Sequence, residues 1–532
     1  MLHICRSNLV EALLDLLAHR LSETPLASPF TPELVVTPSP AMARWVQLGL
    51  ARAHGIAANL TYPLPASFVW QLARDVLGDL PEGDDRQGRG SPPRDRTPER
   101  DALALEPMAW RIYGTLPGLL PDPAFAPLRH YLQPAGDTVK RWQLAERIAD
   151  AFDRYQLYRP DLIRAWSEPQ REAMADGADA WQPLLWRRLT EGIDHHRVAV
   201  IDRLLARLCD RLAAPCPRLP ERVSLFAVSS LPPLLVEVVQ ALAFHTRVDL
   251  YLHAPTDQFW ADLVDQKAQA RRRLEHPEDA ELWEVGHPLL ASWGRQGQAL
   301  QDLLLSREVP AVDVENWVPP PADSLLHRLQ GDIYTLTGPA PDGAREPLTP
   351  DGSLQIQVCH SALRECQVLH DRLLGWFEAE PDLRPEDCLV MIPEIDVYAP
   401  YIEAVFERDP SSARPHIPWN LSDVSLRDEH PLILVFLQIL DLPNSRFGQA
   451  EILSYLDVPE LAAAFGLDPD EVARIKGWLA QARLRWGLDA GHKTRLGLPG
   501  LVENTWAQAE QRMFGGYALG TCGDPEAEGD PA

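Results

Sequence analysis

The first sixty residues alternate short apolar segments with amphipathic segments, and this alternation constrains the fold more than any other feature. Leu2–Cys5 and Leu34–Val36 have the length and apolar content of strands. Residues 9–21 and 42–54 carry apolar side chains at helical spacing, and Asn8 with Glu11 fits a capping box that would begin the first helix. Such strand–helix alternation predicts a parallel α/β sheet.

The pattern returns further along the chain. Four more segments have strand character: Ser224–Val228, Val248–His253, Leu354–Cys359 and Cys388–Ile392. Pro232 and Pro233 open a helix between the first two, and Ser361 precedes a helix between the last two. The stretch 339–352, rich in Pro, Gly and Asp, separates the pairs, so we expect a domain boundary there and a second α/β unit after it.

Other regions lack strand character. Residues 101–210 and 430–512 have helical periodicity, so the first of these regions is expected to be a helical insertion within the first α/β unit. Residues 81–100 (PEGDDRQGRGSPPRDRTPER) are polar and rich in Pro and Gly, which predicts a disordered insertion. The acidic residues 515–532 are expected to form a disordered tail.

Charge and cysteine content exclude several classes of protein. The net charge of −26 argues against coating nucleic acid with the outer surface, although a locally basic internal channel remains compatible with it. The seven scattered cysteines form no CxxC pair and indicate neither a disulfide framework nor a zinc site. No uninterrupted apolar run spans a membrane, and the first residues do not have the pattern of a signal peptide, which favours a cytoplasmic protein.

Catalytic motifs are missing where the fold would place them. The loop after the first strand is only Arg6-Ser7-Asn8, which has no glycine and is too short to wrap a phosphate. Asp265-Gln266-Lys267 fits the letters of a nuclease motif but lies in a helical segment, and His195-His196 has no suitably spaced third ligand, so exposed helix histidines are expected. We therefore predict no catalytic residue, cofactor or metal site in this chain.

Basic and aromatic residues are the remaining candidates for function. Arg44 follows the second strand, Phe68 and Trp70 lie in the run PLPASFVW, and residues 150–161 read DAFDRYQLYRPD. Aromatic faces can stack on bases, and Arg and Asp can bind base edges. From spacing alone, the competing interpretation is that the aromatic residues are core and the arginines are solvated or paired on helices.

Several of these stretches resemble the RecC family, the gamma subunit of exodeoxyribonuclease V. They are GIAANL (55–60), PLPASFVW (63–70), FDRYQLYRPD (152–161), HPLLASWGR (287–295), VLHDRLL (368–374) and RFGQAEILSYLDVPELAAAFGL (446–467). The resemblance runs in order from residue 1 to about 515. It implies an inactivated superfamily 1 helicase-like fold, with RecA-like parallel sheets and helical insertions.

The resemblance also implies a division into domains. Residues 1–80 and 198–338 would form helicase-like domain 1A, interrupted at 81–197 by the disordered stretch and a helical 1B-like insertion. Residues 353–429 would begin domain 2A, and 430–514 would be a 2B-like helical segment. Family chains continue into a nuclease-like C-terminal domain, so this sequence is expected to be a fragment, a split gene product or a frameshifted remnant.

By resemblance, the chain would be a non-catalytic subunit of an ATP-dependent helicase–nuclease that repairs double-strand breaks. Its partners would be RecB and RecD in a heterotrimer, which use ATP and Mg, together with double-stranded DNA ends and single-stranded DNA. The subunit would split the duplex, guide the strands and inspect the 3′ strand for a Chi-like sequence. An assembly scaffold without sequence recognition is the alternative.

Family positions that read DNA correspond here to Leu64, Trp70, Asp150, Asp153, Arg159 and Arg197. Other positions depart from the family pattern. Pro38 and Pro40 replace side chains that carry hydrogen-bonding groups, and Ala151 and Arg154 also differ. Arg44 could instead bind guanine through its guanidinium fork. The sequence recognised is therefore expected to differ from the familiar Chi octamer, or recognition to be lost.

Overall fold

The computed structural model describes residues 1–78, 101–133, 136–168, 179–193, 195–210, 218–264, 270–271, 274, 287–305, 310–338, 349–407, 416–422 and 430–519. By its internal contacts the chain divides into two compact units, residues 1–355 and 356–532. Among the helices of the described residues, none has both the length and the hydropathy needed to cross a bilayer.

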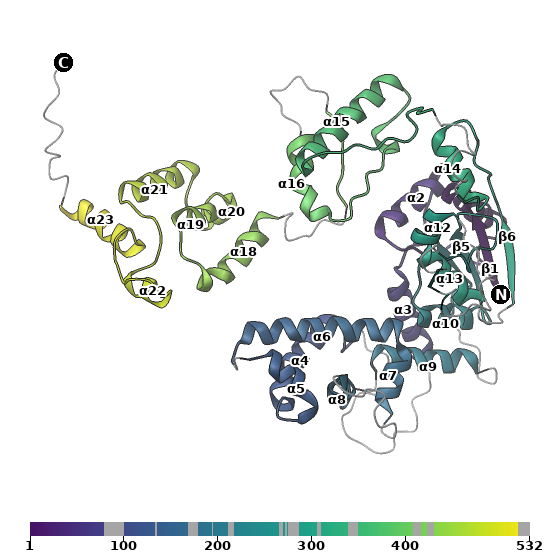
Figure 1. Ribbon diagram of the computed structural model, residues 1–532, viewed down its shortest axis with the longest axis horizontal. Helices are drawn as coiled ribbons and strands as arrows, with labels where there is room; N and C mark the ends of the chain where they lie inside the picture. The colour runs from purple at the N-terminus through teal and green to yellow at the C-terminus, as the bar shows by residue number, and fades with distance from the viewer. Residues whose placement is uncertain are drawn as a thin grey trace. The chain divides into compact units, whose positions relative to one another are not determined.

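The first unit is organised around a six-stranded sheet, part of which is labelled in Figure 1. Its strands are β1 (Leu2–Ser7), β2 (Glu33–Val36), β3 (Leu60–Thr61), β4 (Arg222–Phe226), β5 (Arg247–His253) and β6 (Ala311–Glu315). They lie in the order β3-β2-β4-β5-β1-β6, and every neighbouring pair is parallel. Ile4 of β1 lies opposite Leu250 on one side and Asp313 on the other, so β1 pairs with two strands distant in sequence.

Helices cover both faces of this sheet. Successive side chains of a strand point to opposite faces, so each strand contributes to a core on either side. Leu2 and Ile4 of β1 belong to a large apolar core that includes side chains of α3, α9 and α10. Cys5 belongs to a smaller core on the other face, with side chains of α1 and α2 such as Leu13 and Val46. Both faces of the central strands are therefore buried, and even their polar residues Ser224 and Asp249 are inaccessible to solvent.

The helices of the first unit are α1 (Val10–Glu23), α2 (Pro40–His54), α3 (Pro65–Leu77), α4 (Leu105–Leu119), α5 (Ala126–Tyr131), α6 (Thr138–Tyr158), α7 (Pro160–Ser167), α8 (Trp181–Thr190), α9 (Arg197–Cys209), α10 (Pro233–Leu242), α12 (Pro288–Trp293), α13 (Arg295–Leu305) and α14 (Leu325–Tyr334). Those from α4 to α9 gather along α6 (Figure 1). Phe152 packs its ring 5.8 Å from those of Trp166 and Trp186, and this helical core is continuous with the large core of the sheet.

All regular secondary structure in the described residues of the second unit is helical. Its helices are α15 (Ala362–Ala379), α16 (Ile395–Phe406), α18 (Pro431–Asp441), α19 (Gln449–Tyr455), α20 (Pro459–Ala464), α21 (Pro469–Gln481), α22 (Ala490–Arg495) and α23 (Trp506–Leu519). Cys366 and Leu373 of α15 pack with Ile402 of α16 in one small core. Leu453, Leu479, Leu484 and Ala509 form a separate one.

Two strands predicted for the second unit are wrong. Residues 354–359 and 388–392 form neither helix nor strand, and neither segment pairs with a strand in the described part of the chain. Most of their apolar side chains are exposed, with Val358 94% and Met391 84% accessible, whereas Ile392 packs against the core of α15 and α16. A strand is stable only when neighbours satisfy its backbone groups, and apolar content alone does not supply those neighbours.

The other expected elements can be compared directly. The strands predicted near residues 2, 34, 224 and 248 are confirmed as β1, β2, β4 and β5, and the helix after Ser361 is confirmed as α15. The short strand β3 and the edge strand β6 were not predicted. The expected tail is wrong for residues 515–519, which are helical, while 520–532 and the insertion 81–100 lie outside the described residues.

Candidate nucleic-acid interface

The first group of predicted residues lies where β2 and β3 end. Carboxyl ends of parallel strands meet at one edge of a sheet, which is where α/β folds place their binding sites. The amide of Thr37, after β2, donates to the carbonyl of Pro63, after β3, at 3.1 Å. Helices α2 and α3 begin there, each with proline at its first position, and Ser39 accepts from the amide of Met42 at 3.2 Å.

Leu64, Trp70 and Arg44 belong to the two helices that begin at this edge. Leu64 is the exposed N-cap residue of α3, and Arg44 is exposed on the second turn of α2. Trp70 is half-buried on α3 and packs against the large core. Phe68 is buried core, as the competing interpretation held. An exposed leucine and an exposed guanidinium can therefore contact a ligand, whereas Trp70 offers only part of its ring.

The second group lies at the carboxyl-terminal end of α6. Arg197, the first residue of α9, places its Nη1 3.0 Å from Oδ1 of Asp153 and its Nη2 3.6 Å from Oδ2 of Asp101. On α6 itself, Arg154 lies 2.8 Å from Asp150. The structure thus brings Asp153 and Arg197 together and joins α6 to α9 through an ion pair.

Sequence reasoning missed Asp101. Burial raises the pKa of Asp101, while a hydrogen bond from the Leu103 amide (2.9 Å) and the nearby Arg197 oppose that rise. The only sequence signal was an aspartate placed to accept from an amide two residues later, a common turn feature. Its position beside the polar stretch 81–100 concealed its role as a second carboxylate for Arg197.

Arg159 lies between α6 and α7, as the C-cap residue of the first helix and the N-cap residue of the second. Its Nε and Nη2 donate to Asp161 at 3.1 and 3.0 Å, a two-point contact that raises the pKa of Arg159 and lowers the pKa of Asp161. Both side chains are exposed, so solvent screens this pair and its energy is small. Arg154, Arg159 and Arg197 all contact carboxylates of this chain, so a phosphate must compete with those carboxylates for them.

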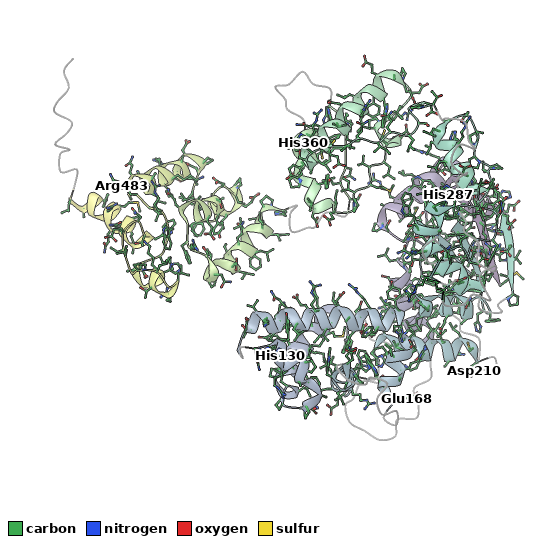
Figure 2. All side chains as sticks on the ribbon, in the orientation of Figure 1. His130, Glu168, Asp210, His287, His360 and Arg483 are labelled. Atoms are coloured by element: carbon green, nitrogen blue, oxygen red, sulfur yellow. The ribbon has the colours of Figure 1, made fainter. Side chains whose placement is uncertain are left out.

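The two groups lie on different parts of the first unit. Arg44, Leu64 and Trp70 belong to the sheet edge, whereas Asp150, Asp153, Arg159 and Arg197 belong to the helical insertion; the packing of α3 against α9 connects the parts. Figure 2 draws the side chains of the helical insertion, with His130 and Glu168 labelled on it.

The turn between β1 and α1 is closed by contacts to its own chain. The Asn8 amide nitrogen donates to the carbonyl of Val318 (2.7 Å), and its oxygen accepts from the Val318 amide (2.9 Å). A ring nitrogen of His253 lies 3.1 Å from the Asn8 carbonyl oxygen. Helix α1 has Leu9 as its N-cap without a side-chain cap. The predicted capping box is therefore wrong, because Asn8 turns away to Val318.

The other residues considered for chemistry have structural surroundings. His196 is not an exposed helix histidine as predicted: it is buried, caps α9 by accepting from the Ala199 amide at 3.3 Å, and contacts the Trp186 ring. No group of three potential metal ligands occurs within the described ranges. Asp265, Gln266 and Lys267 lie outside them.

Comparison with known proteins decides the family. Residues 2–336 match the family described as "RecC, N-terminal domain", and residues 429–529 match "RecBCD enzyme subunit RecC fourth domain". The chain belongs to the RecC family. The RecC subunit of the RecBCD enzyme from Escherichia coli K12 is 35% identical across 97% of this chain and 47% of its own length.

Other RecC proteins align in the same way. Those of Haemophilus influenzae and Mycolicibacterium smegmatis are 30% and 31% identical across 96% and 97% of this chain. The chain spans about half the length of the RecC relatives that it matches. The similarity therefore covers both compact units of this chain.

Proposed function

We propose that this chain is the DNA-guiding part of a RecBCD-type enzyme that processes broken DNA ends, and that it does no chemistry itself. The observation that carries this proposal is the RecC similarity across both units. In this proposal RecB and RecD are its partners and use the ATP and Mg. The chain contributes surfaces that separate the duplex and conduct single strands.

An inactivated superfamily 1 helicase frame is part of the same proposal. The parallel sheet wrapped by helices supports it, with residues 1–80 and 198–338 as domain 1A, 81–197 as its insertion, 353–429 as the start of domain 2A and 430–514 as a 2B-like segment. Asn8 supports the loss of nucleotide binding, because its side chain joins the turn after β1 to Val318. A phosphate-binding loop needs that turn for its ligand.

DNA contact is assigned to both groups of the candidate interface. Leu64, Trp70 and Arg44 would touch bases at the sheet edge, and Arg159 and Arg197 would touch phosphates or base edges. The neighbouring carboxylates would make the second group selective. A DNA strand binds there only if its contacts with the arginines are more favourable than their ion pairs with Asp150, Asp153 and Asp161. Such competition suits inspection of a Chi-like sequence better than uniform conduction.

A crosslinking experiment tests the interface. The chain is assembled with RecB-type and RecD-type subunits on a forked DNA that carries photoreactive bases in its 3′-ended strand. We expect crosslinks within residues 38–70 and 150–197. Labelling confined to other parts of the chain contradicts the site assignment. The isolated chain is expected not to hydrolyse ATP or degrade DNA, and turnover by the purified chain contradicts the non-catalytic role.

An assembly scaffold without sequence recognition is the second candidate. Pro38 and Pro40 favour it, because proline offers no side-chain hydrogen bond to a base. Trp70→Ala and Arg159→Ala separate the two candidates. Under the first, the response of the assembled enzyme to a Chi-like sequence is lost while assembly persists; under the scaffold hypothesis, both are unchanged.

A further inference from the structure

A cluster of aromatic and basic residues lies at the amino-terminal end of α6, away from the candidate interface. The Trp110 and Trp142 rings are 4.2 Å apart, and Tyr113 lies 5.8 Å from Trp142. Tyr131 closes α5 nearby, one residue after His130, which Figure 2 labels. We call this cluster the Trp110 patch; it comprises Trp110, Tyr113, Tyr131, Lys140, Arg141 and Trp142.

The patch presents a supported aromatic surface. Trp110 is 62% exposed, whereas Tyr113 and Trp142 beneath it pack against the large core. The two underlying rings fix the position of the exposed indole, so that little conformational entropy is lost when a planar ligand stacks on it. A single exposed tryptophan is common on protein surfaces. An exposed tryptophan that packs on two further rings has a fixed orientation, which suits stacking of a planar ligand.

Two cations border the platform. Lys140 lies 4.7 Å from the centre of the Tyr131 ring and donates to the Gln133 carbonyl at 3.1 Å. The guanidinium carbon of Arg141 lies 4.0 Å from the Tyr113 ring centre. Within the described residues, neither cation forms an ion pair with a carboxylate. Both can therefore bind a phosphate without displacing a carboxylate of this chain.

A single strand fits this chemistry better than a protein does. Bases stack on an exposed indole and phosphates pair with adjacent cations, which is how sequence-tolerant single-strand sites are built. A protein partner that covered the patch would have to desolvate Lys140 and Arg141, at a cost unless it brought carboxylates. Glu106 and Glu146 lie one turn away on α4 and α6, so the positive charge is local to the patch.

Helix α6 connects the patch to the candidate interface. Trp142 and Asp153 are eleven residues apart, or about three turns and 16 Å, so they lie on nearly the same side of the helix. Ala149, which lies between them on that side, is buried in the large core, so α6 joins the two sites as a rigid element.

We propose that the Trp110 patch binds single-stranded DNA, with a base stacked on Trp110 and phosphates held by Lys140 and Arg141. This rests on the proposed function in assuming that the chain meets single strands, but it uses residues outside the candidate interface. The patch would hold a strand without regard to its sequence, next to a site whose arginines are restrained by carboxylates.

The test uses the full chain and an oligothymidylate substituted with iododeoxyuridine. Anisotropy of a fluorescent copy gives the affinity, and photocrosslinking gives the location. Trp110→Ala is expected to weaken binding about tenfold, since stacking on one aromatic ring contributes about that much. Lys140→Ala with Arg141→Ala is expected to lower the salt slope by about 0.7 for each cation removed. Trp293→Ala, which removes a 78% exposed tryptophan on α12, is the matched control and should bind normally.

Each outcome supports the patch or contradicts it. Crosslinks at Trp110 without crosslinks in 38–70 or 150–197 support the patch and contradict the interface assigned under the proposed function. Crosslinks confined to those two segments, no binding at all, or normal binding by Trp110→Ala contradict the patch. If Trp110→Ala weakens assembly with RecB-type or RecD-type subunits and leaves oligonucleotide binding intact, the patch is a protein interface and the proposal is wrong. Trp110→Phe, which keeps a ring, should retain most of the affinity, and thermal unfolding of each variant checks its fold.

Discussion

Residues 2–36 and 354–392 share one order of parts: an apolar segment, an amphipathic helix and a second apolar segment. In the first region, β1 lies between β5 and β6, which come from residues 247–253 and 311–315. In the second, α15 forms, with Ser361 accepting from the Arg364 amide at 3.3 Å, but the flanking segments pair with no strand of the described chain. A helix satisfies its backbone within itself, whereas a strand depends on distant partners.

Hydrogen exchange should show the largest difference between the two regions. We expect the amides of β1 and β5 to exchange about a thousandfold or more slowly than those of residues 354–358 and 389–391, because the sheet opens only with much of its unit. Peptide-resolved exchange mass spectrometry measures this. Similar protection of the two regions would mean that the second region is paired in solution, which contradicts the comparison.

Cysteine reactivity offers a second measure, because each region carries thiols. Burial raises the pKa of Cys5 in β1 to about 11, whereas Cys359 and Cys388 are partly exposed. Near neutral pH, maleimide should label Cys359 and Cys388 at least about a hundredfold faster than Cys5, because only an accessible thiolate reacts. Exposed Cys209 is the positive control. Labelling of Cys5 at the rate of Cys209 would contradict the burial of β1.

The same thiol gives a pH dependence. An unfolded cysteine loses its proton near pH 9, but folded Cys5 keeps it until about pH 11. Between these values the unfolded state binds fewer protons, so the free energy of unfolding should fall as the pH rises. Urea unfolding of the chain and of Cys5→Ala at several alkaline pH values tests this. The fall should be shallower in the variant, and equal slopes would exclude Cys5 as its source.

Truncation of core leucines should separate the regions by a smaller amount. Leu13→Ala on α1 is expected to cost about 3 kcal/mol, because this leucine is fully buried under the sheet. Leu373→Ala on α15 should cost less, since its small core can collapse more readily around the missing atoms. Leu48→Ala, at an exposed position on α2, should change stability by no more than about 0.5 kcal/mol. Equal costs for Leu13 and Leu373 would contradict the argument.

An effect smaller than that of the buried leucine Leu13 is expected at Asn8. Asn8→Ala removes both hydrogen bonds to Val318 and should lower the free energy of unfolding by about 1 kcal/mol, because the exposed backbone groups can bond to water instead. Asn8→Asp keeps an acceptor for the Val318 amide but places a carboxylate oxygen against the Val318 carbonyl oxygen, so it should also lower the stability. Urea unfolding measures both variants, and unchanged stability in either would contradict the role of these bonds.

Periodicity predicted the parts of the fold that depend on local sequence. The central strands, α1, α2, α10 and α15 follow from apolar spacing, and the RecC resemblance indicates both Asp153 and Arg197, which form an ion pair in the structure. The two-residue strand β3 is too short to show a pattern, and β6 is an exposed edge strand with little apolar character. Asp101 could not be assigned to Arg197 because only the packing of α4 and α9 against α6 brings them together.

The reciprocal bonds of Asn8 also have a consequence for β6. An exposed edge strand of five residues has few side-chain contacts that would stop it from sliding along its neighbour. Asn8, just past the end of β1, binds both the amide and the carbonyl of a single residue beyond the end of β6, and shifting β6 by one position would break both bonds together. The side chain of Asn8 thereby fixes the register of β6 against β1, although the sequence of β6 itself barely specifies a register.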